Sequence, residues 1–137
     1  MQVTPYLFFD GRCEEAVQFY QHVFGAQVDM LMRNRDNPEP PLPGMLPPGS
    51  EDKVLHCSFR IGDTLVMASD GRCQGSTPFQ GFALSVAPTD PAVAEKFFTA
   101  LAEGGQVQMP LAKTFWSPCF GMVTDRFGVL WMLTVAS

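Results

Sequence analysis

The feature that most constrains the fold is an internal duplication. The heptapeptide FGAQVDM at residues 24–30 is similar to EGGQVQM at residues 103–109, and the pattern around each copy predicts a strand, a helix and three further strands. Each half is too small to bury its own sheet, so the two halves are expected to share one core. For 137 residues this predicts a single domain, with a first module at about residues 1–72 and a second at about 79–137.

The first module is predicted to begin with an aromatic-rich strand at residues 4–9. An amphipathic helix follows at residues 13–24, with Asp10 as its predicted cap and Gly25 at its end. Its apolar positions recur at helical spacing and are Ala16, Phe19, Tyr20, Val23 and Phe24. Three more strands are predicted at residues 26–33, 53–60 and 64–69.

The second module repeats this order. A strand is predicted at residues 81–87, and Asp90 caps a helix that has Pro91 at its first position. The apolar face of that helix is predicted to contain Val93, Phe97, Ala100 and Leu101. Three strands follow at residues 106–111, 119–125 and 128–136.

A tight turn at residues 124–128 joins the last two predicted strands. Gly128 is expected to provide the backbone geometry of this turn, and Asp125 is expected to accept a hydrogen bond within it. Arg126 is expected to be a solvated charge.

The segment at residues 34–52 contains six prolines, so it is predicted to be neither a helix nor a central strand. Two interpretations remain open. It is either a solvent-exposed linker or a mobile flap over a pocket, since long loops in compact domains are often lids.

Composition excludes several classes of protein. No stretch approaches about 18 apolar residues, and the N-terminus lacks the pattern of a signal peptide, so a cytoplasmic protein with no membrane partner is expected. The net charge is -5 and the basic residues are scattered, which argues against nucleic acid as a partner. The four cysteines form no CxxC motif and are expected to be reduced thiols.

Three stretches together resemble the vicinal oxygen chelate superfamily, which includes glyoxalase I, extradiol dioxygenases, and fosfomycin and bleomycin resistance proteins. They are PYLFFDGRCEEAVQFYQHVFGA, VLHCSFRIGDTLVMASD and FWSPCFGMVTDRFGVLWML, and the chain is most similar to the PhnB-like group. The resemblance implies an α+β fold of two paired βαβββ modules that form a glyoxalase-like mixed sheet, and a homodimer. Members are also labelled demethylubiquinone methyltransferase-like, but the chain has no glycine-rich loop after a strand for S-adenosylmethionine.

Metal enzymes of this superfamily take three or four His or Glu ligands from the first and last strands of the modules. By the resemblance, these positions fall near Pro5, Met67, Gly81 and Met132. None of the four side chains is a carboxylate or an imidazole. The expectation is therefore a protein without the family metal site and without a cofactor.

Strand alternation predicts which residues line a cavity. Leu55, Cys57 and Phe59 are expected to pack under the helices, while His56, Ser58 and Arg60 point to the opposite face. His56 is the candidate acid or base. The alternative is a histidine satisfied by a neighbour or by solvent, and His22 is expected to be exposed. The predicted ligand-binding set is Tyr6, Phe8, His56, Ser58, Met67, Ser69, Trp116, Met122 and Met132, and the alternative for these residues is ordinary core.

The first functional hypothesis is a protein that binds a small organic molecule in an apolar cavity without turnover. The second is an enzyme of the same superfamily, with an unusual metal set or with His56 as a general base. A nucleophilic pair of His56 with Cys57 or Cys119 is also conceivable, although nothing in the spacing supports this pair. A structural dimer without a ligand is the third hypothesis.

Overall fold

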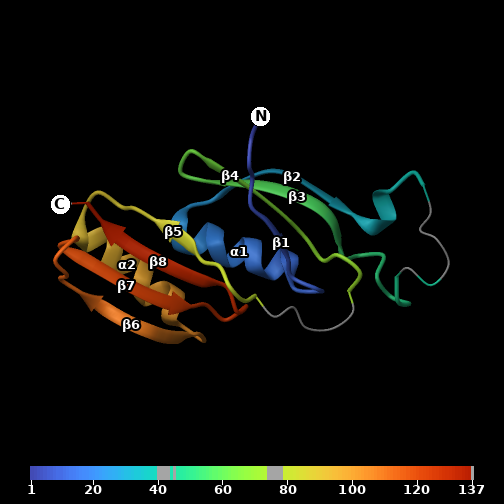
Figure 1. Ribbon diagram of the computed structural model, residues 1–137. Coiled ribbons are helices and arrows are strands. Elements are labelled where there is room, and N and C mark those ends of the chain that lie inside the picture. The colour runs from blue at the N-terminus through green and yellow to red at the C-terminus, as the bar shows by residue number, and fades with distance from the viewer. Residues whose placement is uncertain (40–43, 45, 74–78, 137) are drawn as a thin grey trace. The chain divides into compact units, whose positions relative to one another are not determined.

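A computed structural model describes residues 1–39, 44, 46–73 and 79–136, and the chain divides into two compact units, Met1–Thr77 and Pro78–Ser137 (Figure 1). The first unit contains β1 (Tyr6–Phe8), α1 (Cys13–Phe24), β2 (Gln27–Arg33), the 3-10 helix η1 (Asn34–Asp36), β3 (Val54–Ile61) and β4 (Thr64–Ser69). The second contains β5 (Leu84–Val86), α2 (Pro91–Ala102), β6 (Gln106–Ala112), β7 (Cys119–Thr124) and β8 (Leu130–Val135). The first strand of each unit, β1 and β5, is shorter than predicted.

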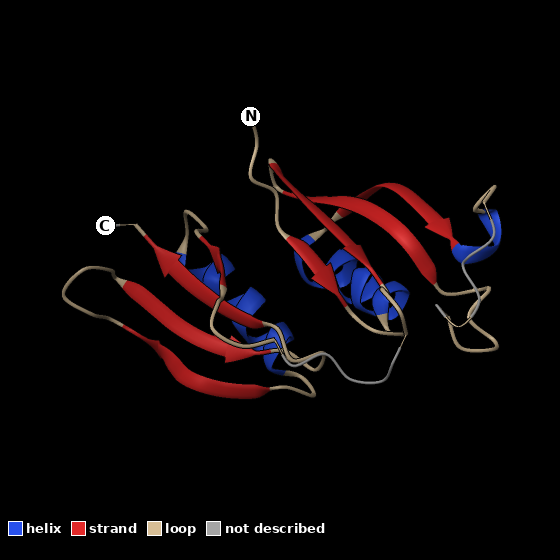
Figure 2. Ribbon diagram, turned by 45° about the vertical axis from the view of Figure 1, so that its right-hand side comes forward, coloured by secondary structure: helices blue, strands red, loops and turns tan. Residues whose placement is uncertain are grey.

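Each unit has its own four-stranded mixed sheet within the described residues. The strand orders are β1-β4-β3-β2 and β5-β8-β7-β6. In each sheet the first strand runs parallel to the last, and the other pairings are antiparallel. Figure 2 shows one long helix beside each sheet. The predicted α+β class and the duplicated element order are confirmed.

The duplication extends to local irregularities. Both long helices are followed by a glycine with positive φ, 70° at Gly25 and 73° at Gly104. The next strand of each unit then has a register shift, between Val28 and Met30 in β2 and between Val107 and Met109 in β6. Such bulges re-aim side chains at the edge of a sheet.

The core of the first unit lies between α1 and its sheet. Tyr20 of α1 and Phe59 of β3 are both fully buried, and their rings stack with centroids 6.2 Å apart. Cys57 is also buried, as expected, but Leu55 is half-buried and Val54 is buried instead. Within the described residues no helix is long and apolar enough to cross a membrane.

The predicted cap of α1 is wrong. Asp10 has a φ of 55° and does not cap the helix, and the N-cap position is Arg12. The carboxylate of Asp70, just after β4, instead accepts hydrogen bonds from the backbone N–H groups of Gly11 and Cys13, both at 2.8 Å. Its other oxygen accepts from Val54 N at 2.8 Å, so one carboxylate joins the start of α1 to the start of β3.

The cap of α2 is as predicted, but of the predicted buried face only Leu101 is fully buried. The side chain of Asp90 accepts from the backbone N–H of Ala92. The predicted face is shifted by about one residue, because Val93 is 38% exposed and Phe97 and Ala100 are only half-buried. The buried residues are Ala94, Phe98 and Leu101, which are spaced by four and three along the helix.

The last hairpin is organised by Asp125. One carboxylate oxygen accepts from the backbone N–H groups of Phe127 and Val129, and the other accepts from Trp131 Nε1 at 2.8 Å. Gly128 has a φ of 92° and donates to the backbone oxygen of Asp125, so the predicted turn geometry is confirmed. Arg126 is exposed, although its side chain donates to the Glu103 carbonyl oxygen.

The proline-rich segment begins with the short helix η1, which the sequence did not predict. The backbone N–H groups of Asn34 and Arg35 donate to the carbonyl oxygens of Lys53 and Glu51, so the described ends of the segment lie together. Residues 40–43 and 45 lie outside the described residues. Whether the segment is a linker or a flap stays a prediction.

Candidate functional site

The face of the first sheet opposite α1 carries most of the predicted binding residues. Strand alternation places Leu7, Cys57, Phe59 and Ala68 on the buried side of the sheet. The opposite face, which we call the Tyr6–His56 face, consists of Tyr6, Phe8, Met30, Met32, His56, Ser58, Arg60, Leu65 and Met67.

The centre of this face is a contact between a phenol and an imidazole. The register places Tyr6 beside Met67, and Met67 beside Ser58. The Tyr6 side chain therefore crosses β4 to reach His56 of β3, and its hydroxyl lies 3.1 Å from His56 Nδ1. The ring centroids of Tyr6 and His56 are 5.6 Å apart, and those of Tyr6 and Phe8 are 4.9 Å apart.

This contact leaves chemistry available at His56. The imidazole is half-buried, and within the described residues its Nε2 has no hydrogen-bond partner. If Tyr6 donates to Nδ1, a neutral imidazole carries its proton on Nε2 and presents a donor there; the opposite tautomer presents an acceptor. The arrangement can hold a polar group of a ligand, or exchange a proton with it.

Two methionines of β2 join this face although the sequence interpretation omitted them. Met32 pairs with His56, and Met30 pairs with Ser58. The alternation of the two methionines in QVDMLMR indicates that they share one face of the strand. Their placement beside His56 and Ser58 could not be read from it, because it depends on the bulge and on the strand pairing. They add polarizable thioethers around the polar pair.

Ser69 differs in burial from the other residues of this sheet that were predicted to bind a ligand. It is only 2% exposed, and its hydroxyl accepts a hydrogen bond from the backbone N–H of Gly71 at 3.1 Å. Phe8, which pairs with Ser69, is 51% exposed. Ser69 therefore shapes the turn after β4, while Phe8 presents a ring to the surroundings.

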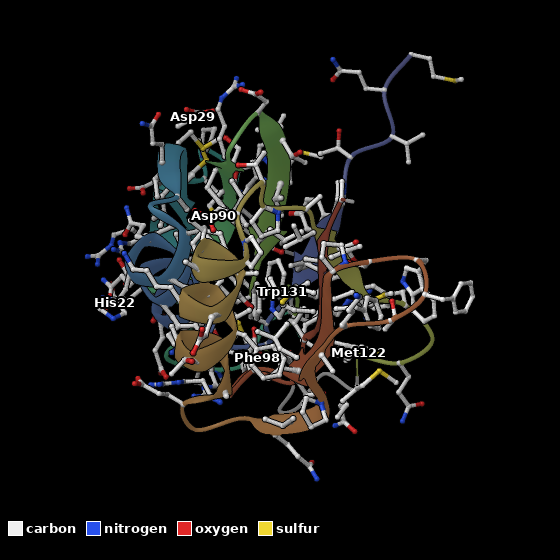
Figure 3. The ribbon with its side chains drawn as sticks, turned by 90° about the vertical axis from the view of Figure 1, so that its left-hand side faces the viewer. His22, Asp29, Asp90, Phe98, Met122 and Trp131 are labelled. Atoms are coloured by element: carbon white, nitrogen blue, oxygen red, sulfur yellow. The ribbon has the colours of Figure 1, made fainter. Side chains whose placement is uncertain are left out.

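Of the two conceivable nucleophilic pairs with His56, the structure contradicts the one with Cys57. Cys57 is fully buried on the α1 side of β3, while His56 lies on the opposite face. The Cys57 thiol contacts Cys13, and this hydrogen bond, together with burial, raises the pKa of the Cys13 thiol. His22 is exposed on α1, as predicted, and is labelled in Figure 3.

The remaining predicted residues lie in the second unit. Met122 and Met132 form a cross-strand pair on the face opposite α2, and Figure 3 shows Met122 on the other side of the sheet from Phe98. Trp116 lies in the loop between β6 and β7, is 49% exposed, and packs edge-on against Phe120, with centroids 5.4 Å apart. A common cavity lined by both units stays a prediction.

The register also corrects the positions compared with the superfamily metal ligands. The residue of β1 beside Met67 is Tyr6 rather than Pro5, and the residue of β5 beside Met132 is Ser85, because Gly81 precedes the strand. Thioethers, a phenol and a hydroxyl do not fit the His and Glu set of the metal enzymes. Within the described part of the chain, no group of three or more His, Cys, Asp or Glu residues is placed to hold a metal ion.

Known proteins similar to this chain identify its family. A family model described as 3-demethylubiquinone-9 3-methyltransferase matches residues 1–134. Protein YjdN of Escherichia coli K12 is 33% identical, over 98% of this chain and 95% of that protein. The crystal structure of PA1353 from Pseudomonas aeruginosa is 39% identical, covers 99% of this chain and 98% of that one, and has a TM-score of 0.86.

Other solved structures connect the chain to the wider fold. The PhnB protein from Bacillus cereus is 29% identical with a TM-score of 0.83, over 99% of this chain and 100% of that one. A glyoxalase-related enzyme from Fulvimarina pelagi is 18% identical (TM-score 0.59; 98% and 88% covered), and the fosfomycin resistance protein FosX from Listeria monocytogenes is 11% identical (TM-score 0.65; 100% and 93% covered). These two share the fold alone. The chain therefore belongs to the PhnB-like family whose model is described as 3-demethylubiquinone-9 3-methyltransferase, and it has a glyoxalase-like fold.

Proposed function

We propose that this protein binds a small organic molecule on the Tyr6–His56 face, without the metal site of the superfamily enzymes. The observation that supports this proposal is the 3.1 Å contact between Tyr6 Oη and His56 Nδ1 on a face whose other members are mainly aromatic rings and thioethers. A few polar groups on an apolar surface are typical of small-molecule sites. The proposed ligand therefore has an apolar body and one polar group that meets the imidazole.

We propose that Trp116, Met122 and Met132 offer a second apolar surface for small organic molecules, on the second unit. Met132 lies beside Met122 in the sheet, and Trp116 contacts Phe120, which lies two residues before Met122 on β7. Thioether groups adapt to ligands of varied shape at a small cost in free energy.

We also infer that the protein acts as a cytoplasmic homodimer. The superfamily resemblance supports the dimer, and the four cysteines are all free, which fits a reducing compartment. Light scattering during size-exclusion chromatography measures the mass directly. A mass near that of one 15.1 kDa chain at micromolar concentration would contradict the dimer.

The test of binding uses protein labelled with 13C at the methionine methyl groups. Fosfomycin, bleomycin and a set of aromatic ketones are titrated while the Met67 and Met32 signals are followed, since both residues lie on the Tyr6–His56 face. Fosfomycin is included because FosX shares the fold and is a fosfomycin resistance protein. A ligand of the proposed kind shifts these signals saturably.

The matched pair His56→Ala and His22→Ala distinguishes a site from a general effect. Both substitutions remove an imidazole, but His22 lies exposed on α1, away from the proposed site. His56→Ala is expected to weaken binding by about fivefold or more, the value of one lost hydrogen bond, and His22→Ala is expected to leave it unchanged. Equal effects of the two changes, or no saturable shift with any compound, would contradict the proposal.

A second candidate function is an enzyme in which His56 transfers a proton. The observation that favours it is the orientation of the imidazole by Tyr6, which leaves Nε2 available to a substrate. Tyr6→Phe then lowers turnover and changes its pH profile, while binding is largely retained. Binding without any detectable product supports the first candidate instead.

A further inference from the structure

The second unit contains a hollow on the face of its sheet opposite α2. Its volume is about 450 Å³, within the usual range of small-molecule sites. The residues that line it include Phe79, Phe82, Gln108, Met122, Thr124 and Leu130.

This hollow occupies the same place in its repeat as a hollow of about 470 Å³ in the first unit. The first hollow is lined by Arg60 and Leu65, which form a cross-strand pair near the end of the β3–β4 hairpin. Thr124 and Leu130 form the corresponding pair between β7 and β8. The neighbouring strands β2 and β6 show the same correspondence, because Gln27 pairs with Arg60 and Gln106 pairs with Thr124.

In each unit the residue at the register shift, Asp29 or Gln108, forms a hydrogen bond with the strand residue of this pair, Arg60 or Thr124. The chemistry of the two contacts differs. In the first unit, Arg60 Nε donates to Asp29 Oδ2 at 2.9 Å, so the position holds an ion pair. In the second unit, Gln108 Nε2 donates to Thr124 Oγ1 at 3.1 Å, so the position is neutral. Duplicated hollows thus have different electrostatics, and no side chain that lines the second one carries a charge.

Aromatic rings complete the second hollow. Phe79 and Phe82 pack edge to face, with centroids 6.2 Å apart and an interplanar angle of 73°. Phe82 is nevertheless 45% exposed, so much of its surface is available to another ring. Gly128 has a φ of 92°, and a side-chain carbon there would lie 3.7 Å from the Phe79 ring.

We propose that this hollow binds a neutral aromatic molecule that carries a hydroxyl or amide group. The rings and Met122 enclose the aromatic body, and Gln108 and Thr124 meet the polar group. After the bond between them, the amide retains a carbonyl acceptor and a second N–H, and neither side chain has another partner within the described residues. A carboxylate is disfavoured because no cation lines the hollow to replace its hydration.

The experiment compares 2-naphthol with 2-naphthoate, which differ in charge but share the ring system. Each is titrated into protein with 13C-labelled methionine methyl groups, and the Met122 signal is followed. We expect saturable shifts at Met122 with 2-naphthol, and affinity for 2-naphthoate at least about tenfold weaker. No saturable shift at Met122, or equal affinity for both compounds, overturns the proposal.

A matched pair of variants tests the polar contact. Thr124→Val removes the hydroxyl within the hollow, whereas Thr134→Val makes the same change on the same sheet face, beside Phe120 and outside the hollow. Thr124→Val is expected to weaken 2-naphthol binding about fivefold, and Thr134→Val less than about twofold. Equal weakening by the two variants overturns the assigned role.

Two further variants address folding and specificity. Phe82→Ala removes a half-exposed ring, so it is expected to fold normally and to weaken 2-naphthol binding about fivefold. His22→Ala, at an exposed position on α1, is expected to leave that binding unchanged. Loss of 2-naphthol binding in His22→Ala, or unchanged binding in Phe82→Ala, overturns the inference without deciding the proposed function.

Discussion

At the scale of single residues, His56 is half-buried and is expected to contribute little to the stability of the fold. Within the described residues its side chain makes one hydrogen bond, to Tyr6. We therefore expect His56→Ala to fold and to change the free energy of unfolding by less than about 1.5 kcal/mol, the value of one net hydrogen bond. Urea unfolding measures this change, with His22→Ala as the control. Failure of His56→Ala to fold would mean that His56 belongs to the core.

Asp125 is the opposite case, because its carboxylate satisfies three donors in a buried hairpin. Asp125→Asn replaces one acceptor oxygen with a donor, so at least one buried N–H loses its partner. We expect a loss of about 2–3 kcal/mol in the free energy of unfolding, and a change in Trp131 fluorescence. Asp63→Asn, at an exposed turn, is the control and is expected to be nearly neutral. Equal stability of the two variants would refute this account of the hairpin.

At the scale of elements, the join between α2 and β6 requires a glycine. A side-chain carbon at Gly105 would overlap the carbonyl oxygen of Thr124 and lie 3.0 Å from Asp125 Cα. We expect Gly105→Ala to cost about 1–3 kcal/mol or more in thermal or urea unfolding. The first repeat has Ala26 at the equivalent position, so Ala26→Gly is the control and is expected to cost less than Gly105→Ala.

The start of α1 is joined to the end of β2 by an ion pair that responds to pH. The Arg33 guanidinium lies 2.6 Å from Glu14 and lowers the pKa of that carboxyl below its ordinary value of 4.5. A carboxyl with a lowered folded pKa stabilises the fold above its unfolded pKa, and this contribution is lost as the pH falls through the folded value.

Glu14→Gln is therefore expected to lower the melting temperature slightly at neutral pH, and the difference from the original chain should vanish in acid, well below pH 4.5. The effect is small because the Glu14 side chain is 44% exposed. Melting curves across this range measure it, with Glu95→Gln as the control, because Glu95 is exposed and forms no ion pair within the described residues. A difference that grows toward acid would contradict the sign of the argument.

The elements also show which parts of the fold are local enough to predict. The duplicated order, the Asp90 cap and the Gly128 turn depend on neighbours in the sequence, and all were confirmed. The α1 cap was missed because Asp70 is 57 residues away from Cys13. At the site, alternation predicted the face of His56 correctly. The Tyr6–His56 contact could not be predicted, because it depends on the parallel pairing of β1 with β4.

At the scale of the whole molecule, the proposed function predicts low metal content. The positions compared with the superfamily ligands are occupied by Tyr6, Met67, Ser85 and Met132, which are poor donors for hard divalent ions. Protein purified without chelator is expected to contain far less than one equivalent of metal per chain by elemental analysis. Stoichiometric zinc, nickel, manganese or iron, retained after dialysis, would refute this expectation.

The role of Asp70 has a consequence for synthesis on the ribosome. The N–H groups at the start of α1 obtain their carboxylate partner only after residue 70 has been translated and has left the exit tunnel. Until then a nascent chain has the sequence of the helix without the group that completes its first turn. We therefore expect the first repeat to become protease-resistant in one late step during translation, after its last strand has emerged.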